Sequence, residues 1–510
     1  MKLLRALAVL ALTSVNTHAA KPVNTQGWCQ VGNGDFTVIS QMSPSATAVW
    51  ADRLNQFLHA MNGRLRVDGR ILGPFTIVLF RNIDDFWQSA PVLSGGAPLN
   101  SLAAFSREAG WGSLAASCEL GSTEGTRRMI FQTGVSWLMS GDHRPRPPTL
   151  QKGIGAAYST YVIENNEEVF GRPIYGASSH IVGIENHPMA SNERFLPIEE
   201  LLAVRDINTV ADRHDTLMFS LESWGFAHFL LFSKDMVRRH AMEHLLDAFA
   251  HTSDPHDALK IAFGEDARII NSLFLDYMRG GNFYEVTCPL EPAPPLRSPA
   301  PAPQALVASV LARLEASVHN LDVARAYAEQ AVRLAPNDSS SYDALAMVDF
   351  FAKRFPETAA DCREAIRLET RDGWTWLEAS ELLGRSGAEG STLPTLLPIT
   401  SEKGREAINL CEKAILCRRG LTVAFDRIAA LIPIADHVTE DDGKFLALGQ
   451  TLFPNDGWIE IGRAQWARRV HEPALALKLL DDVLARSAAL SSGSVEKARM
   501  LRAQWAAGPG

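Results

Sequence analysis

The spacing of hydrophobic and polar positions changes along the chain. Residues 35–41 (DFTVISQ) and 75–81 (FTIVLFR) are rich in β-branched and aromatic residues, which is typical of strands. Between them, residues 43–65 open with Ser-Pro and place apolar residues at helical spacing, which predicts a helix. Residues 101–107 and 111–117 are expected to form a further pair of strands. The pattern is mostly helical after residue 126, so strands followed by helices predict an α+β fold.

One of these helices has an unusual face. Phe131, Val135 and Leu138 follow the spacing i, i+4, i+7 and form a continuous apolar stripe, which predicts a buried helix. Gly134 lies within it and costs ~1 kcal/mol relative to alanine in a helix interior. We expect this glycine to be retained because a neighbouring element packs closely against it.

The second half of the chain contains a repeat. Residues 331–338 (AVRLAPND) recur as residues 365–372 (AIRLETRD), an offset of 34 residues, with small residues at matching helical positions. This period is typical of helix–turn–helix units, and residues 327–338 and 457–485 resemble tetratricopeptide repeats. About five units are expected, with an insertion at 384–404 in the third and a closing helix at 495–506. This part is therefore expected to be an all-α solenoid.

The two parts are joined by a segment rich in proline. Residues 288–304 (CPLEPAPPLRSPAPAPQ) favour an extended, semi-rigid spacer with no regular hydrogen bonds. The expected division is a signal peptide at 1–20, an α+β domain at 21–288, a linker at 289–304 and repeats at 305–510. The linker is expected to be the protease-sensitive joint.

The N-terminus has the three parts of a secretory signal. Lys2 and Arg5 precede the apolar run 6–15 (ALAVLALTSV), and small residues follow for cleavage after Ala19 or Ala20. The run is too short to span a bilayer, and no cysteine follows it directly to carry a lipid anchor. We therefore expect an exported bacterial protein, periplasmic or secreted, with no transmembrane segment.

Composition narrows the function class. The 510 residues carry a formal net charge of −9, with 46% hydrophobic and 21% charged residues, which suits a globular protein of two or three domains. No basic field points to nucleic acid. Six cysteines do not make a disulfide scaffold. A Cys29–Cys118 pair is compatible with an oxidising compartment, whereas Cys411 and Cys417 are expected to face different sides of one helix.

The order of segments in the first part resembles a known family. A strand ends in FRNIDDF (80–86), a strand pair and a helix follow, and the next helix reads PTLQKGIGAAY (148–158). LPIEELL (196–202), FSLESWGFAHFLL (219–231) and AFGEDARIINSLFLDYM (262–278) complete the series. Over most of residues 28–282 this resembles the peptidase-MA-like domains of the gluzincin clan, which often occur beside tetratricopeptide repeats. The resemblance implies a mixed sheet followed by helices.

In that family two histidines of a His-Glu-x-x-His helix and a glutamate of the next helix bind zinc. The resemblance places Phe131 and Val135 at the histidines, Gln132 at the general base and Lys152 at the third ligand. None of these four side chains can act as the zinc ligand or general base expected at its position, and residues 124–140 contain no histidine. We therefore expect no zinc, no other cofactor and no catalytic residue at this place. Lys152 is expected either to extend its head to water or to meet an acidic partner, with Gln132 beside it, and to help hold the helices together.

Two other histidine positions are candidate sites. His240 to His244 (HAMEH) matches the inverted His-x-x-Glu-His of another zinc-peptidase class, but its histidines follow the polar face of an amphipathic helix. A structural zinc site or exposed surface histidines are favoured over catalysis, and of these two the exposed surface histidines are the favoured interpretation. His228 lies in a segment that the family shares and is a candidate for lining the cleft, although a buried, hydrogen-bonded histidine is favoured.

These observations lead to three hypotheses on function. The first is an exported, non-catalytic peptidase-like protein whose repeat array binds a protein or peptide in its groove. The second is a hydrolase or peptidase that uses a different site, or a cleft rebuilt around Gln132, Lys152 and His228. The third is a structural scaffold in an envelope complex.

Overall fold

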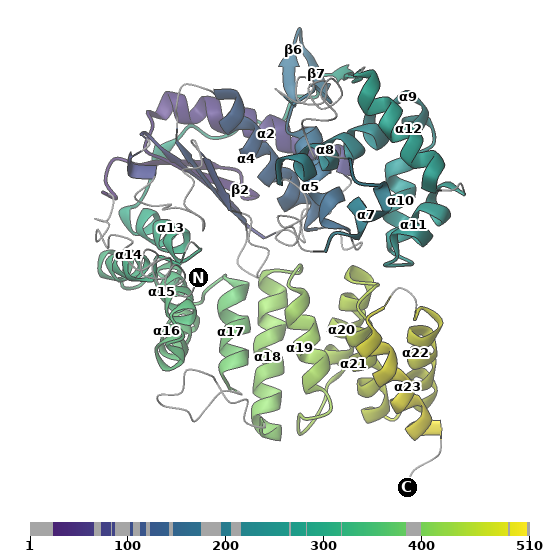
Figure 1. The fold of residues 1–510 in the computed structure, drawn as a ribbon. Coiled ribbons are helices and arrows are strands. Elements are labelled where there is room, and N and C mark those ends of the chain that lie inside the picture. The colour runs from purple at the N-terminus through teal and green to yellow at the C-terminus, as the bar shows by residue number, and fades with distance from the viewer. Residues whose placement is uncertain are drawn as a thin grey trace, which may run out of the picture.

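A computed structural model describes the chain in segments, and Figure 1 shows their arrangement. An α+β part lies above a row of paired helices that starts beneath the sheet. Within the described segments, no helix is both long and apolar enough to cross a membrane. The expected signal peptide lies outside these segments, which are 24–65, 73–82, 84–86, 102–105, 113–118, 123–141, 146–174, 195–205, 216–264, 267–281, 283–317, 319–383, 399–487 and 490–506.

The main sheet has the strand order β4-β5-β3-β2-β1-β9. The expected strands are present as β2 (Phe36–Ser40), β3 (Phe75–Phe80), β4 (Leu102–Phe105) and β5 (Ser113–Cys118). β3 pairs in parallel with β2 and with β5, because the chain crosses over between them. β4 runs antiparallel to β5, and β1 (Cys29–Gly32) runs antiparallel to β2 and to β9 (Ala300–Pro301). The sheet is therefore mixed, as expected.

Both faces of this sheet are buried, and the alternation along β3 shows how. Phe75, Ile77 and Leu79 point into a core with α2 (Pro44–Leu65) and α4 (Thr123–Met139). Val78 and Phe80 point the other way, into a second core that includes α13 (Gln304–Ser317), the first helix of the repeats. In Figure 1, α13 lies directly beneath the sheet and α2 and α4 lie above it. The sheet and the first repeats thus share one hydrophobic core instead of forming separate ones.

Helices complete the N-terminal part. α5 (Pro148–Tyr158) packs against α4 and against α8 (Thr216–Phe232), which is buried over most of its length. A small second sheet consists of β6 (Val162–Glu164), β7 (Glu167–Phe170) and β8 (Val286–Pro289). The remaining helices, at the right of Figure 1, are α7 (Ile198–Ala203), α9 (Lys234–Arg238), α10 (Ala241–Phe249), α11 (Pro255–Phe263) and α12 (Ala267–Gly280).

The C-terminal part consists of antiparallel helix pairs. The first helices of the pairs are α13, α15 (Ser339–Phe351), α17 (Gly373–Leu383), α19 (Thr422–Leu431) and α21 (Gly457–Arg469). Their partners are α14 (Leu321–Leu334), α16 (Phe355–Arg367), α18 (Ser401–Cys417), α20 (Glu440–Leu452) and α22 (Pro473–Ala485), and α23 (Ser492–Ala506) follows. α15 and α17, the first helices of the second and third pairs, begin 34 residues apart, at residues 339 and 373. The predicted helix–turn–helix repeat is confirmed.

The turn inside a pair is itself repeated. His319, Lys353 and His471 each have a positive φ, near 60°, between the two helices of a pair. After each, the next N–H donates to a carbonyl five residues back, as Arg354 does to Asp349 at 2.8 Å. This is the hydrogen bond of a Schellman helix end, formed here without glycine. His319 and Lys353 are 34 residues apart, so the backbone conformation repeats with the same period as the sequence.

The proline-rich segment differs from its prediction. Its ends pair with strands: β8 with β7, and β9 with β1. In between, Gln56 of α2 donates to the carbonyl of Glu291 at 2.7 Å and accepts from the N–H of Ala293 at 2.9 Å. Asn55 donates to the carbonyl of Pro294 at 2.7 Å. The expectation of a spacer without regular hydrogen bonds is therefore wrong, because side-chain amides of α2 pair with the polar backbone groups that proline leaves available.

None of the six cysteines forms a disulfide. Cys29 lies on β1 beside the hydroxyl of Thr47 in α2, whereas Cys118 lies on β5 in the core on the α13 side. β2 and β3 separate these strands, so the two sulfurs cannot meet. Cys411 is buried and Cys417 is exposed, which confirms that they face different sides of α18.

Candidate functional site

The face of α4 on which the resemblance places metal ligands is hydrophobic core. Phe131 is 1% exposed and Val135 is fully buried. The ring of Phe131 stacks on that of Phe57 from α2, with centroids 4.0 Å apart and planes 6° apart. Tyr161 approaches both rings, at 5.5 Å from Phe57 and 6.2 Å from Phe131. These positions hold α4 to α2 through aromatic packing.

Gly134 lies at the closest point of this packing. A Cβ there would be 3.1 Å from Cδ2 of Leu58 and 3.5 Å from Cε1 of Phe57. The first distance is tighter than ordinary van der Waals contact and the second is within it, so the Leu58 side chain would have to shift by a few tenths of an ångström to admit a larger residue. The prediction that a neighbour packs closely against Gly134 is confirmed.

Gln132 of α4 and Lys152 of α5 are both partly exposed. The Lys152 ammonium lies 5.6 Å from the ring centroid of Phe219 in α8, a cation–π distance. Burial lowers the Lys152 pKa below its ordinary value. Within the described segments Lys152 has no acidic partner. Of the two environments expected for its head, the structure thus shows an aromatic ring and partial solvent instead of an ion pair.

Gln132 packs against the small residues of α5. Its Cγ lies 3.0 Å from the place of a Cβ on Gly155, so the glutamine chain occupies the space that this glycine leaves open. Residues 123–141 and 146–158 belong to the described segments, and in all of these segments no group of three histidine, cysteine or acidic side chains could hold a metal ion.

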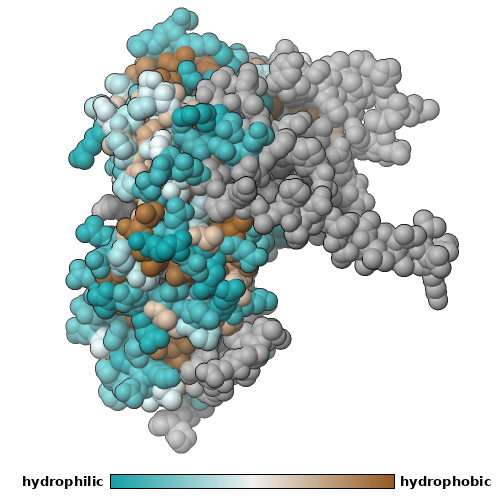
Figure 2. Space-filling model, turned by 90° about the vertical axis from the view of Figure 1, so that its left-hand side faces the viewer, coloured by the Kyte–Doolittle hydropathy of each residue, from teal (hydrophilic) through white to brown (hydrophobic). Residues whose placement is uncertain are grey.

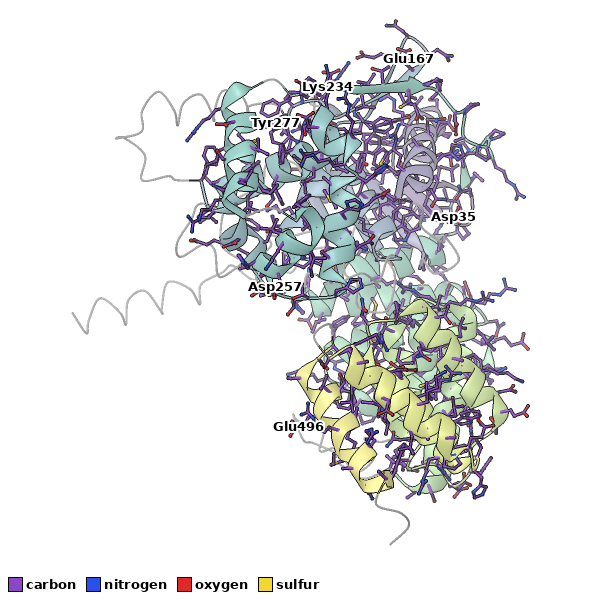
Figure 3. All side chains as sticks on the ribbon, turned by 90° about the vertical axis from the view of Figure 1, so that its right-hand side faces the viewer. Asp35, Glu167, Lys234, Asp257, Tyr277 and Glu496 are labelled. Atoms are coloured by element: carbon purple, nitrogen blue, oxygen red, sulfur yellow. The ribbon has the colours of Figure 1, made fainter. Side chains whose placement is uncertain are left out.

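His228 lies inside the protein. It is fully buried in α8, its Nε2 lies 2.6 Å from the carbonyl oxygen of Gly171, and its Nδ1 lies 2.8 Å from the Tyr277 hydroxyl. A carbonyl can only accept, so Nε2 carries the proton and Nδ1 accepts from Tyr277. Burial lowers the His228 pKa to about 4, so the ring is neutral. Figure 3 labels Tyr277 on the helical side of the N-terminal part.

The inverted histidine motif lies on the surface. His240 and His244 are exposed, and their ring centroids are 6.5 Å apart. The apolar residues of α10, Met242, Leu245, Leu246 and Phe249, are buried, as the amphipathic pattern predicts. His240 precedes α10 with a left-handed backbone, and its Nδ1 lies 3.6 Å from Glu243. This motif therefore forms the solvated face of a helix.

The sequence did not reveal a polar pocket beside the proline-rich segment. It has a volume of about 140 Å³ and is bordered by the β1–β2 turn, α2 and the end of α4, and by Pro294. Asn33 donates to Asn55 at 3.2 Å across it, and Trp137 forms an apolar wall. Asp35, labelled in Figure 3, lies at its rim. The Asn-Gly-Asp turn was the available signal, but the partners come from segments far away in the sequence.

The surface of the repeats is uneven in polarity. Figure 2 shows the side formed by the first repeats as largely hydrophilic, with small separate apolar patches. Further along, large apolar residues are exposed where a second helix ends and the next pair begins. Leu416 is 65% exposed, Val423 52% and Trp458 44%. These residues are the candidate contacts for a partner.

Comparison with known proteins gives limited likeness. No family model matches the chain, and no curated protein matches it. A solved structure of YrrB, described as a TPR protein with an unusual peptide-binding site, is 16% identical, with a TM-score of 0.28. That match covers 36% of this chain and 86% of YrrB.

Two longer matches are weaker. Yeast Tom70 is 10% identical over 74% of this chain and 82% of its own, with a TM-score of 0.20. The APC/C hetero-tetramer Cut9–Hcn1 is 13% identical over 74% and 83%, with a TM-score of 0.19. None of these three proteins is described as a peptidase. Scores this low carry no argument about function, and the repeat fold rests on the chain's own helix pairs.

Proposed function

We propose that this chain is an exported protein that binds a protein or peptide through its repeat array, and that its α+β part is a non-catalytic support of peptidase-like ancestry. One observation carries the proposal. The second face of the sheet is covered by the first repeats, with Val78 and Phe80 in one core with Val307 and Leu311 of α13. The array is thereby anchored at one end to the sheet.

Anchoring at one end leaves the later units to meet a partner. Helical repeats contact mainly their neighbours, so they present long surfaces suited to extended segments or helices. The exposed Leu416, Val423 and Trp458 all lie in the third to fifth units, away from the sheet. Exposed apolar side chains are expected on a surface that binds a partner. Repeats that served only to support the α+β part would not need them.

The absence of catalysis at α4 is part of the proposal. Phe131 and Val135 fill the space of metal ligands with hydrocarbon and stabilise the contact with α2. We expect purified protein to contain no stoichiometric zinc and to show no peptidase activity. One zinc per chain, lost to a chelator together with activity, would contradict this part.

A rebuilt catalytic cleft is the competing function. It requires Gln132, Lys152 and His228 to act together, yet both ring nitrogens of His228 are hydrogen-bonded inside the core. The scaffold hypothesis differs from ours in needing no separable ligand. A complex that dissociates and re-forms with a defined affinity favours the binding function over the scaffold.

Export is proposed from the sequence of residues 1–20. Expression of the full chain followed by cell fractionation and N-terminal sequencing tests it, with a mature N-terminus after Ala19 or Ala20 as the expected result. A chain that keeps Met1 and stays with the cytoplasmic fraction would contradict it.

The binding function is tested by crosslinking the mature protein in envelope extracts and mapping the linked peptides by mass spectrometry. We expect a saturable partner whose crosslinks fall on residues 399–506. Crosslinks confined to residues 24–281, or the lack of any saturable partner, would overturn the proposal.

A further inference from the structure

The polar pocket beside the proline-rich segment has three uncommitted polar side chains at its border. Asp35, His59 and Asn62 line it, and all three are exposed. Within the described segments, none of these side chains forms a hydrogen bond or an ion pair. Asp35 belongs to the β1–β2 turn, while His59 and Asn62 are three residues apart on α2 and share a helix face. These groups can therefore exchange their water contacts for contacts to a ligand.

Hydrogen bonds join three of the segments that border the pocket. Oδ1 of Asn33 accepts from the backbone N–H groups of Asp35 at 3.0 Å and Phe36 at 3.3 Å. Nδ2 of Asn33 donates to Asn55 at 3.2 Å. Asn55, which is buried, donates in turn to the carbonyl of Pro294 at 2.7 Å. The turn, α2 and the proline-rich segment are thus held together before a ligand arrives, which lowers the entropic cost of binding.

One wall of the pocket is apolar and fixed in place. It consists of Leu58 of α2 and of Trp137 and Leu138 of α4, all of them buried. Nε1 of Trp137 donates to the carbonyl of Gly73 at 2.7 Å, and the indole stacks on the ring of Phe75 with centroids 5.4 Å apart. Its N–H is therefore committed, and the side chain contributes hydrocarbon surface. A few polar groups beside an apolar wall are typical of small-molecule sites.

We propose that the polar pocket binds one neutral sugar unit. The Asp35 carboxylate accepts hydrogen bonds, whereas the Asn62 amide and the His59 imidazole can donate as well as accept. A sugar hydroxyl also does both, so several hydroxyl groups match this mixture. The C–H groups of the sugar ring pack on the wall formed by Leu58 and Trp137. The proposal goes beyond the repeat array, because it concerns the α+β part and the proline-rich segment alone.

The volume of the pocket sets the size of the ligand. Drug-sized molecules occupy clefts of about 300–1,000 Å³. The polar pocket has a volume of about 140 Å³. This limits the ligand to a single small ring, either a free monosaccharide or the end unit of a glycan. An extended peptide segment would need a longer groove.

Charge argues against other occupants. An anionic ligand would meet the carboxylate of Asp35. A cationic side chain would pair with Asp35 but leave the donors of His59 and Asn62 beside a positive charge. No group of three metal-binding side chains exists in the described segments, so a metal ion lacks ligands there. An apolar ligand would remove water from all three polar groups without replacing it, which is costly.

The test is a calorimetric titration of the purified full chain with glucose, galactose and N-acetylglucosamine. Saturable binding of at least one sugar is expected, with a Kd in the millimolar range. Asp35→Ala should weaken it at least about tenfold, because a hydrogen bond to a charged group is lost. Asp52→Ala, at an exposed carboxylate of α2 that does not line the pocket, is the matched control and is expected to change nothing. Circular dichroism melting verifies that each variant is folded.

Hydrogen exchange locates the bound sugar. Because Pro294 lines the pocket and Asn55 holds its carbonyl, saturation with the sugar should slow amide exchange at residues 290–293 and 33–36. Exchange in α21, α22 and α23 should stay the same. Methyl glycosides, whose anomeric oxygen is blocked as in a glycan, distinguish the two sources of the ligand. A methyl glycoside that binds as tightly as its parent sugar indicates the end of a glycan, and one that binds more weakly indicates a free sugar.

Several results would overturn this inference. They are the lack of saturable binding of all three sugars, an Asp35→Ala variant that binds as tightly as the wild type, and exchange protection confined to residues 305–506. Methylguanidinium and acetyl-glycyl-glycine amide serve as probes of a basic side chain and of a peptide backbone. Binding of either in preference to the sugars also overturns it. A saturable partner crosslinked to residues 399–506 would keep the binding function in each of these cases.

Discussion

The rings of Phe57 and Phe131 lie stacked 4.0 Å apart at the place where the resemblance puts the first zinc ligand. Because Phe131 is 1% exposed and also meets Tyr161, replacing its ring removes aromatic packing on two sides. We predict that Phe131→His lowers the free energy of unfolding by about 2–4 kcal/mol, the range of large core truncations with an added buried polar group. Urea denaturation measures this, with Gln132→Glu as the partly exposed control that is expected to cost much less.

Adding the other ligands extends this prediction. Phe131→His, Gln132→Glu, Val135→His and Lys152→Glu together should give a protein that is too unstable to hold zinc at one per chain, because the imidazoles replace the contacts that position α4 on α2. Metal analysis after dialysis provides the measurement. A folded variant with one bound zinc would show that the backbone at these four positions can form a zinc site and that the aromatic stack is dispensable.

Lys152 gives a second prediction, which revises the role expected for its charge. Since no acidic side chain in the described segments pairs with it and burial lowers its pKa, the charge itself opposes folding. Lys152→Met keeps the stem and should leave thermal stability unchanged or raise it. Lys152→Ala, which also removes the stem, should be the less stable of the two. A Lys152→Met variant destabilised by more than ~1 kcal/mol would show that the ammonium holds the helices together.

The proline-rich segment is predicted to resist proteolysis. Gln56 and Asn55 hold it by three hydrogen bonds to its backbone, each worth about 1 kcal/mol, and strand pairing fixes both ends. Limited proteolysis of the folded protein should therefore cut elsewhere before residues 289–304. Gln56→Ala should accelerate cleavage there, while Asp52→Ala, at an exposed position of the same helix, should not. Early cleavage of the wild type inside the segment would restore the picture of a free spacer.

Local patterns predicted the elements, and long-range contacts supplied the rest. The runs at 35–41 and 75–81 became β2 and β3 because β-branched and aromatic residues suit a pleated, buried surface. Both runs are apolar on both sides of the strand, which indicates that both faces of the sheet are covered. The runs do not indicate which segment covers the second face. The first repeats cover the second face through Val307 and Leu311, which lie more than 200 residues after β3 in the sequence.

The candidate sites divide in the same way. The loss of metal donors at Phe131 and Val135 is visible in the sequence because it concerns residue type alone. The polar pocket beside the proline-rich segment is not visible there, because Asn33, Asn55 and Pro294 come together only in the folded chain. The hydrogen bonds to the proline-rich segment could not be predicted from its composition either. A high proline content shows that backbone N–H donors are few, but it does not show which side chains donate to the carbonyl groups.

His228 makes the stability of this protein depend on pH. Its folded pKa of about 4 lies below the value of 6.5 expected in the unfolded chain, because the ring is buried between Gly171 and Tyr277. Below pH 6.5 the unfolded chain takes up a proton that the folded protein does not, so stability falls as the pH drops from 6.5 toward 4. The difference between the two pKa values corresponds to about 3 kcal/mol of folding free energy, which is fully present at pH 7.5.

In urea titrations at several pH values, His228→Gln should lose this part of the pH dependence, even though it is less stable at every pH. Tyr277→Phe, which removes only the hydroxyl that donates to Nδ1, should keep most of the dependence at a cost of about 1 kcal/mol. A wild type and a His228→Gln variant with parallel stability profiles between pH 7.5 and pH 4 would show that His228 takes up its proton in the folded state, contrary to the buried neutral ring described above.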